Sequence, residues 1–224
     1  MEEIEIINKI ELTKKDALIV VDMQNDFIPG GALSVEEGDL IINDINKAII
    51  KCRNQGCHVV LTQDWHPPDH LSFASNHPGK NPFDEFSSDD GAIGPVLWTD
   101  HCVQNTQGAE FHKDLKKEFA DKIIKKGMNP RIDSYSGFQD NDKKSETGLR
   151  KYLEYEGIKR IFICGLALDY CCYYTAVDGI NFGFDVFLLI DLTKGIDSPE
   201  GSIKNALEHM KEIGIKYTNS VSFV

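Results

Sequence analysis

The 224-residue chain lacks any apolar run that approaches the roughly 20 residues needed to span a bilayer. Its first residues, Met1 to Glu5, also lack the basic segment and the apolar segment of a secretory signal peptide. These absences argue against a transmembrane helix and against export. We therefore expect a soluble, cytoplasmic protein with no membrane partner.

Basic residues are also fewer than acidic ones. The chain has 24 Lys and Arg against 36 Asp and Glu, which gives a formal net charge of −12. A surface with this charge repels phosphate backbones and anionic lipids. We expect no nucleic-acid partner, and we expect the ligand to be a small molecule; a homo-oligomer remains open.

Paired cysteines are missing as well. The chain has six cysteines, but no two of them have the C-x-x-C spacing of zinc or redox motifs. Cys164 falls in an apolar run, and Cys171 and Cys172 are adjacent, so we expect reduced thiols, as in cytosol. Cys52 and Cys57 are close in sequence, but a helix end and a strand start should hold them apart.

Apolar runs alternate with helical patterns along the chain. Residues 17–21 form a continuous apolar run, typical of a strand buried on both faces, and residues 42–52 repeat apolar side chains at helical spacing. Further strands are expected at 57–63, 123–124, 160–165, 186–190 and, as a terminal edge strand, 215–223; further helices at 146–156, from near 171, and 198–213. This order predicts right-handed parallel crossovers. We expect one α/β domain, residues 1–224, with helices on both faces of a mainly parallel sheet.

A long connection, residues 67–110, is rich in Pro, Gly, Asp and Ser. Loops of that length are usually either functional or disordered. This loop carries His70, Trp98 and His101, which favours a functional role.

A candidate metal site begins at the end of the strand predicted at residues 57–63. Asp64 and His66 follow it two residues apart, so the alternation of a strand directs both side chains to the same face. With His101 from the long loop they make a three-ligand set with open positions, and His70 is a further candidate ligand. Such a set accepts zinc, iron or manganese. The alternative is that these are ordinary polar residues at a strand–loop junction.

Polar or reactive groups follow four different predicted strands. Asp22, Asp64 and Lys126 lie at strand ends, and a fourth strand leads into the segment before Cys171. Parallel sheets bind ligands beyond the carboxyl ends of their strands, so these groups are expected to share one site. Taken singly, each has a plainer explanation: a turn, a surface lysine or a small buried thiol.

Cys171 is the predicted nucleophile. Because it is expected to open a helix, free N–H groups and the helix dipole should lower its thiol pKa from about 8.5 toward neutrality, and Lys126 should act in the same direction. Asp22 could then carry a proton from the thiol to a leaving amine. The backbone N–H groups of Ala167 and Cys171 could receive the oxyanion of an acyl-transfer reaction.

These segments resemble one family in order and in spacing. The chain is similar to the nicotinamidases, or pyrazinamidases, of the isochorismatase-like cysteine hydrolase superfamily. The matching segments are VVDMQNDF (20–27), DWHP (64–67), DH (69–70), DHCVQ (100–104), KG (126–127), DSYSGF (133–138) and GLALDYC (165–171).

The resemblance implies an amidohydrolase that converts nicotinamide to nicotinate and ammonia through a cysteine thioester, in NAD salvage, and that also deamidates pyrazinamide. It implies a three-residue catalytic set, made of Asp22, Lys126 and Cys171. It also implies one divalent metal ion, most often zinc, with the ligands Asp64, His66 and His101; His70 matches a position that ligates the metal in only some relatives.

The remaining site residues are implied in the same way. The ring of nicotinamide would bind the metal through its nitrogen and lie against the substrate-binding residues Phe27, Trp98 and Tyr135. A cis peptide between Leu166 and Ala167 would direct the Ala167 N–H into an oxyanion hole shared with Cys171.

Two rival functions fit part of the pattern. A carbamoyl or ureido amidohydrolase of the same superfamily would keep the three catalytic residues but need not keep the metal ligands. A metal-binding or thiol redox sensor would use Cys171 beside Cys172 without turnover, but it leaves Asp22 and Lys126 unexplained.

Overall fold

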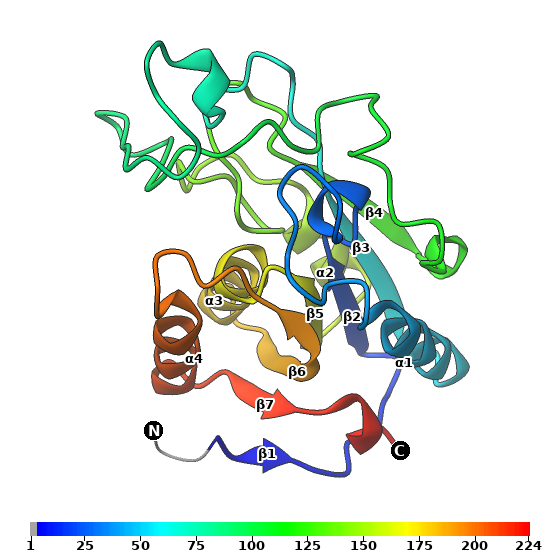
Figure 1. Ribbon diagram of the computed structural model, residues 1–224. Helices are drawn as coiled ribbons and strands as arrows, with labels where there is room; N and C mark the ends of the chain where they lie inside the picture. Colours follow the sequence, from blue (N-terminus) through cyan, green and yellow to red (C-terminus); the bar gives the residue numbers. More distant parts are fainter. Residues whose placement is uncertain (1–3) are drawn as a thin grey trace.

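Seven parallel strands form one sheet in a computed structural model that describes residues 4–224 (Figure 1). The spatial order of the strands is β1-β7-β6-β5-β2-β3-β4. Their bounds are Ile6–Ile7 (β1), Asp16–Val21 (β2), His58–Asp64 (β3), Lys122–Lys126 (β4), Arg160–Leu166 (β5), Asp185–Lys194 (β6) and Lys216–Thr218 (β7).

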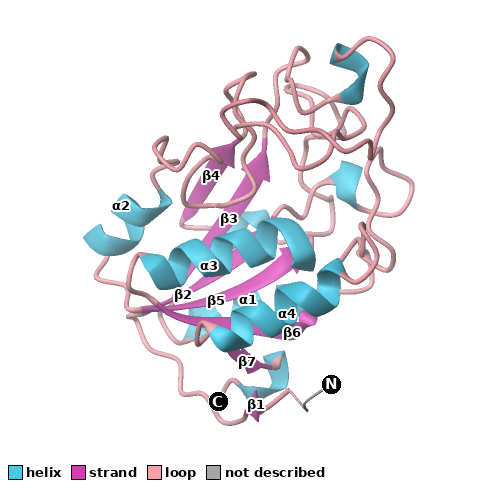
Figure 2. Ribbon diagram, turned by 90° about the vertical axis from the view of Figure 1, so that its left-hand side faces the viewer, coloured by secondary structure: helices cyan, strands magenta, loops and turns pink. Residues whose placement is uncertain are grey.

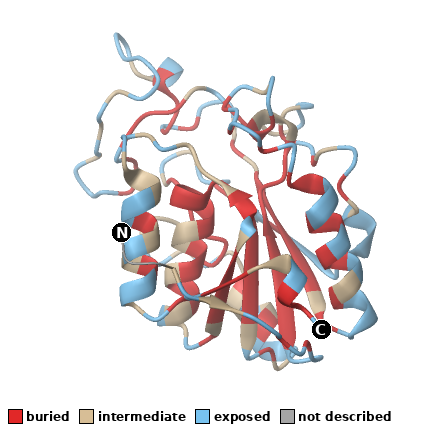
Figure 3. Cartoon of the chain, turned by 60° about the horizontal axis from the view of Figure 1, so that its bottom comes forward, coloured by how far each residue is buried: buried red, intermediate tan, exposed pale blue. Residues whose placement is uncertain are grey.

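Helices cover both faces of this sheet. They are α1 (Ile42–Asn54), α2 (Leu149–Tyr155), α3 (Tyr173–Asn181) and α4 (Ser202–Glu212). Helix α1 packs against β2 and β3, whereas α3 packs against β5 and β6 and beside α4. Figure 3 shows the buried strands between two helical layers whose outer faces are exposed. The predicted three-layer α/β/α fold is confirmed.

The central strands are those with the longest apolar runs. All six residues of β2 are buried, and so are six of the seven in β5. The one carboxylate in β2, Asp16, is paired with Arg160 at the start of β5, with its Oδ2 2.7 Å from the guanidinium Nη2. Burial on both faces explains why these strands lack the alternation of a half-exposed strand.

The N-terminal segment contains a strand that the sequence did not predict. β1 pairs with β7 through Ile6 and Tyr217, so β7 is the second strand of the sheet and the prediction of a terminal edge strand was wrong. β1 is only two residues long and lies in a polar stretch, which gives too little pattern to recognise. β6 runs to Lys194, past the predicted end at residue 190.

The four strands that the sequence linked to function are neighbours in the order β5-β2-β3-β4. Their carboxyl ends therefore meet along one edge, and the register places Asp64 directly opposite Lys126. The long loop, residues 67–110, lies beyond this edge, as Figure 2 shows past the arrowheads of β3 and β4. A small apolar cluster of its own, Ala74, Ile93 and Leu97, packs inside the loop.

Two further expectations can be compared with the structure. All six cysteines are free and buried. Within residues 4–224, none of the helices is both long and apolar enough to cross a membrane.

Candidate active site

Cys171 lies in a tight turn that follows the central strand β5. The last peptide bond of the strand, Leu166–Ala167, is cis, and a π-helical turn, Leu168–Cys172, leads into α3. Cys171 is thus the fourth residue of a buried turn rather than the first residue of a helix. Gly165 permits this path, because its φ is 111° and a Cβ there would lie 2.1 Å from the Val21 carbonyl oxygen.

Lys126, at the end of β4, contacts side chains that lie at or beyond the ends of β2, β3 and β5. Its Nζ lies 2.9 Å from Asp22 Oδ2 and 3.3 Å from Cys171 Sγ. It also donates to Asp64 Oδ1 and, at 3.0 Å, to the Ser134 carbonyl oxygen. The structure therefore brings the three predicted catalytic side chains together in one buried cluster.

Burial governs the charges in this cluster. Burial would lower the pKa of Lys126, but the carboxylates of Asp22 and Asp64 raise it well above its ordinary value, so the ammonium stays charged. Burial raises the pKa of Asp22, against the opposing effect of Lys126. Asp22 is thus a stronger proton acceptor than an ordinary aspartate.

The expected lowering of the Cys171 pKa is not what the structure gives. Burial raises the pKa of this thiol well above its ordinary value, and although Lys126 lowers it, Asp22 raises it again. The prediction relied on the dipole of a helix that begins at Cys171, and no such helix start exists there. The resting thiol is therefore neutral, and it needs a nearby base to give up its proton.

Asp64, His66 and His101 form the predicted three-residue cluster. Their candidate ligand atoms all lie within 4.8 Å of one another, and Asp64 Oδ2 is 3.5 Å from His66 Nε2 and 3.8 Å from His101 Nε2. Nδ1 of His66 lies 2.9 Å from the Gly127 carbonyl oxygen, and Nδ1 of His101 lies 2.8 Å from that of Thr99. A carbonyl can only accept, so each Nδ1 carries a hydrogen and each Nε2 is left facing Asp64, where a metal ion would bind. These residues therefore fit a divalent metal ion.

The charges of the cluster agree with this fit at Asp64 and His101. At His66 burial lowers the pKa, but the Asp64 carboxylate raises it above the ordinary value, so a bound ion would take the place of a proton there. Burial and the neighbouring His66 lower the pKa of His101 to about 4, so its ring is neutral. Burial opposes ionisation of Asp64, but Lys126 and the histidines hold its pKa below the ordinary value. A carboxylate beside a neutral imidazole is a donor set that suits zinc and similar ions.

Gln24 supports the metal cluster, although sequence reasoning gave it no role. Its Nε2 donates to the carbonyl oxygen of Asp64 and its Oε1 accepts from the Asp64 N–H, both at 2.8 Å. It thereby holds the end of β3 in place across the sheet edge. Only its position two residues after Asp22 in the matched segment could have pointed to it.

His70 does not join the metal cluster. Its ring lies 4.3 Å from that of His66 between centroids, but its Nδ1 is hydrogen-bonded to Ser72 Oγ at 2.7 Å and its Nε2 faces the Ile132 carbonyl oxygen at 3.2 Å. Its ring packs against the ring of His66 instead.

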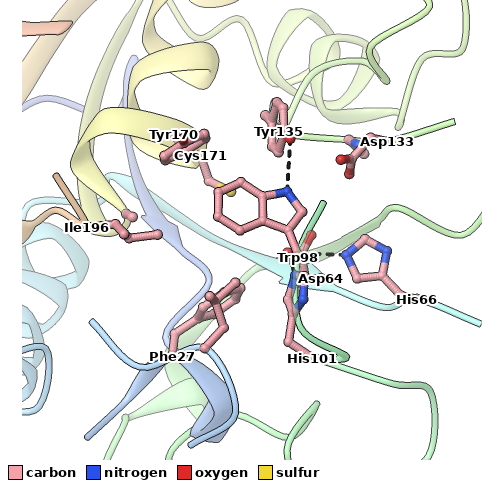
Figure 4. A pocket seen from close by; sticks show the side chains of 13 residues that line it. Phe27, Asp64, His66, Trp98, His101, Asp133, Tyr135, Tyr170, Cys171 and Ile196 are labelled. Atoms are coloured by element: carbon pink, nitrogen blue, oxygen red, sulfur yellow. Dashed lines mark hydrogen bonds and ion pairs between the residues drawn. The ribbon is translucent and has the colours of Figure 1, made fainter. Parts of the chain in front are cut away.

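A pocket with about 360 Å³ of empty space connects the thiol to the metal cluster. Figure 4 shows Phe27, Trp98 and Tyr135, the three predicted substrate-binding residues, around it. The Trp98 Nε1 donates to the Tyr135 hydroxyl at 3.0 Å, which fixes both rings. The sequence did not single out five further lining residues: Leu33, Asp133, Ser134, Tyr170 and Ile196.

Comparison with known proteins agrees with this geometry. Residues 16–221 match the isochorismatase domain. The chain belongs to the isochorismatase family. The match excludes β1 but includes every residue of the pocket and of the metal cluster.

Relatives within the isochorismatase family are close to this chain over most of its length. It is 45% identical over 205 residues to a nicotinamidase of Acinetobacter baylyi, covering 91% of this chain and 92% of the relative. A solved nicotinamidase/pyrazinamidase of Acinetobacter baumannii superposes with a TM-score of 0.87 at 44% identity, covering 92% of this chain and 97% of the other. A Pyrococcus horikoshii pyrazinamidase solved in complex with zinc has a TM-score of 0.75 at 44% identity, covering 92% and 99%.

Proposed function

We propose that the protein is a nicotinamidase that hydrolyses nicotinamide to nicotinate and ammonia, in cytoplasmic NAD salvage, and that it also deamidates pyrazinamide. One observation carries the proposal: Lys126 Nζ lies 2.9 Å from Asp22 Oδ2 and 3.3 Å from Cys171 Sγ, and Cys171 lines a pocket that also holds a candidate metal-binding cluster. The high identity to nicotinamidases of 44–45% supports the substrate.

The covalent step uses the neutral thiol and the buried carboxylate. Asp22 accepts the proton of Cys171 as Sγ bonds to the carboxamide carbon, and the same proton then leaves with the amine as ammonia. Water hydrolyses the resulting thioester, which releases nicotinate and restores the thiol. Burial raises the pKa of Asp22, which makes it a better acceptor for this proton, and the Lys126 ammonium opposes the rise in the Cys171 pKa that burial causes.

Lys126 and the backbone stabilise the charges that form. The Lys126 ammonium lies against both the proton acceptor and the sulfur, so it compensates negative charge on either one. The N–H groups of Ala167 and Cys171 are the proposed oxyanion donors, and each such donor typically contributes about 10² to 10³ in rate.

We propose that Asp64, His66 and His101 hold the divalent ion, which is zinc in the similar Pyrococcus pyrazinamidase. The bound ion would supply a Lewis-acid contact for the pyridine nitrogen. The chain itself orients the ring with Phe27 and Trp98, so the carboxamide faces the thiol.

Ammonia release tests this function. Reduced protein supplied with zinc should release ammonia from nicotinamide and from pyrazinamide, whereas N-carbamoyl and ureido compounds should give much slower release. Release only from the ureides would support the rival amidohydrolase. No release from any of these substrates would overturn an enzymatic role.

Replacement of the nucleophile tests the proposed roles. Cys171→Ala should lower kcat by a factor of about 10⁴ or more, because no other thiol lines the pocket. The zinc content by elemental analysis should stay that of the unmodified protein. A loss of zinc in this variant would show that nucleophile and metal ligands are not separate groups.

A further inference from the structure

Asp133 is an acidic residue of the pocket wall that the proposed reaction does not use. It follows β4 in the loop that also carries Tyr135, and it is 2% exposed. In Figure 4 its side chain lies on the same side of the pocket as His66. A buried carboxylate in a ligand pocket needs an explanation, because burial of an unpaired charge is costly.

The Asp133 carboxylate has a fixed orientation. Its backbone N–H donates to the Ala92 carbonyl oxygen at 2.8 Å, and its carbonyl oxygen accepts from the Asn141 N–H at 2.8 Å. Its Oδ1 accepts from the Ser134 N–H at 2.8 Å. The two backbone bonds fix the residue and the third fixes its carboxylate, whose Oδ2 is left without a donor.

Asp133 Oδ2 has no hydrogen-bond partner among the described residues, and it is inaccessible to solvent. The nearby Tyr135 hydroxyl donates its hydrogen to the Gly94 carbonyl oxygen instead, at 3.1 Å. A buried acceptor left without a donor costs about 1–3 kcal/mol. The usual explanation for such an atom is a bound water or ion.

The position of Asp133 decides between direct and indirect contact with a metal ion. Among the described residues, one candidate metal-binding set contains two histidines: Asp64, His66 and His101. Their ligand atoms lie within 4.8 Å of one another, and Asp133 is not part of the set. Its carboxylate nevertheless lines the same pocket. A carboxylate in this place can reach the ion through an intervening water, as outer partners of metal sites commonly do.

We propose that Asp133 is a positioning residue of the metal site, and that its Oδ2 accepts a hydrogen bond from a water ligand of the ion. The inference rests on the proposed metal site of Asp64, His66 and His101. Asp133 would thereby help to hold the ion and would fix one of the positions that the three protein ligands leave open.

Metal affinity measured by competition with a chromogenic chelator tests the proposal. Asp133→Asn keeps the size of the side chain and an oxygen for the Ser134 N–H, but it removes the charged acceptor. We expect its Kd for Zn²⁺ to rise about 10- to 100-fold, the usual effect of losing an outer partner. The Tm of the metal-free variant should stay the same or rise, because an unpaired buried charge is removed.

Asp142→Asn is the matched control. Asp142 is in the same loop and loses the same charge, but it does not line the pocket and its carboxylate binds Lys144 and Ser145. Its Kd for Zn²⁺ should stay within about twofold of the unmodified protein. Equal weakening in both variants would mean a general charge effect and would overturn the proposal.

Three other results would also overturn it. An unchanged Kd with a lowered Tm of metal-free Asp133→Asn would show a purely structural role. An unchanged Kd with a raised KM for nicotinamide would show that Oδ2 meets the substrate. If the unmodified protein itself binds no Zn²⁺ yet releases ammonia, the metal site fails while the amidase function stands.

Discussion

At the scale of single residues, Lys126 is a buried cation whose charge is balanced by two ion pairs. Its ammonium is inaccessible to solvent and contacts two buried carboxylates, those of Asp22 and Asp64. Removal of one partner from a buried ion pair leaves uncompensated charge and typically costs about 3–5 kcal/mol. We expect Lys126→Met to lower the free energy of unfolding of the metal-free protein by that amount, measured by urea denaturation.

Lys122→Met provides the control for this prediction. Lys122 is in the same strand, β4, but it is exposed. Its replacement should change the free energy of unfolding by no more than about 0.5 kcal/mol. Equal losses in the two variants would mean that the buried ion pairs do not stabilise the fold.

His70 gives the protein a predictable sensitivity to acid. Burial lowers its pKa from 6.5 to about 3. As pH falls below 6.5 the unfolded chain binds a proton at this residue while the folded chain does not, so the folded state loses stability. Each pH unit in this window should cost up to about 1.4 kcal/mol from this residue.

Urea denaturation of metal-free protein between pH 6 and pH 4 measures this effect. His70→Gln should flatten the dependence of unfolding free energy on pH by about one proton. A slope unaffected by His70→Gln would contradict the depressed pKa.

At the scale of elements, Asp169 ties the nucleophile turn to the loop after β6. Its Oδ1 accepts from the Ile196 N–H and its Oδ2 from the Asp197 N–H, both at 2.9 Å, and Oδ2 also accepts from Ser202 Oγ at 2.5 Å. The next residue, Tyr170, donates to the Ser198 carbonyl oxygen. Since Ile196 lines the pocket, this connection sets the position of one pocket wall.

Replacement of Asp169 should therefore loosen substrate binding. Hydrogen bonds to a charged group contribute about 1.5–3 kcal/mol, and 1.4 kcal/mol is tenfold in affinity. We expect Asp169→Asn to raise KM for nicotinamide about tenfold with a smaller change in kcat. Asp178→Asn, at a buried aspartate of α3 that does not line the pocket, should leave KM unchanged. A large fall in kcat alone would assign Asp169 to the chemistry instead.

The elements differ in how far sequence could predict them. β2, β3 and β5 carry long apolar runs that follow from burial on both faces, and their ends fell within about one residue of the prediction. β1 carries no such signal, because its two residues are ordered by pairing with β7, which is more than 200 positions away. Pairing at that distance leaves no local pattern.

The same distinction holds for the candidate site. Cys171, Lys126 and Asp22 could be placed at strand ends from sequence, and the sheet order brings those ends together. The pKa of Cys171 could not be predicted, because it depends on burial rather than on a local helix start. Asp133 and Gln24 were missed because their roles depend on contacts made across the fold.

At the scale of the whole molecule, residues 6–10 and 216–224 together form one edge of the sheet. β1 pairs with β7, and Ile10 exchanges backbone hydrogen bonds with the C-terminal segment, its N–H donating to Ser222 and its carbonyl oxygen accepting from Val224. Phe223 between them is fully buried and lies 5.0 Å from Phe162 of β5 between ring centroids. The last residues therefore belong to the core although they lie far from the pocket.

Replacement of Phe223 by alanine tests how much the packing of this segment contributes to the free energy of unfolding. A large-to-small change at a buried phenylalanine typically costs about 3–5 kcal/mol, so Phe223→Ala should lower the free energy of unfolding by that amount in urea denaturation. Val221→Ala, at a side chain that is 81% exposed, should cost no more than about 0.5 kcal/mol. Because Phe223 does not line the pocket, kcat and KM of the folded Phe223→Ala protein should equal those of the unmodified enzyme. Lost stability with unchanged kinetics would show that the chain ends stabilise the sheet and leave the site alone; altered kinetics at temperatures where the variant is folded would show that strain at the termini reaches the carboxyl edge of the sheet.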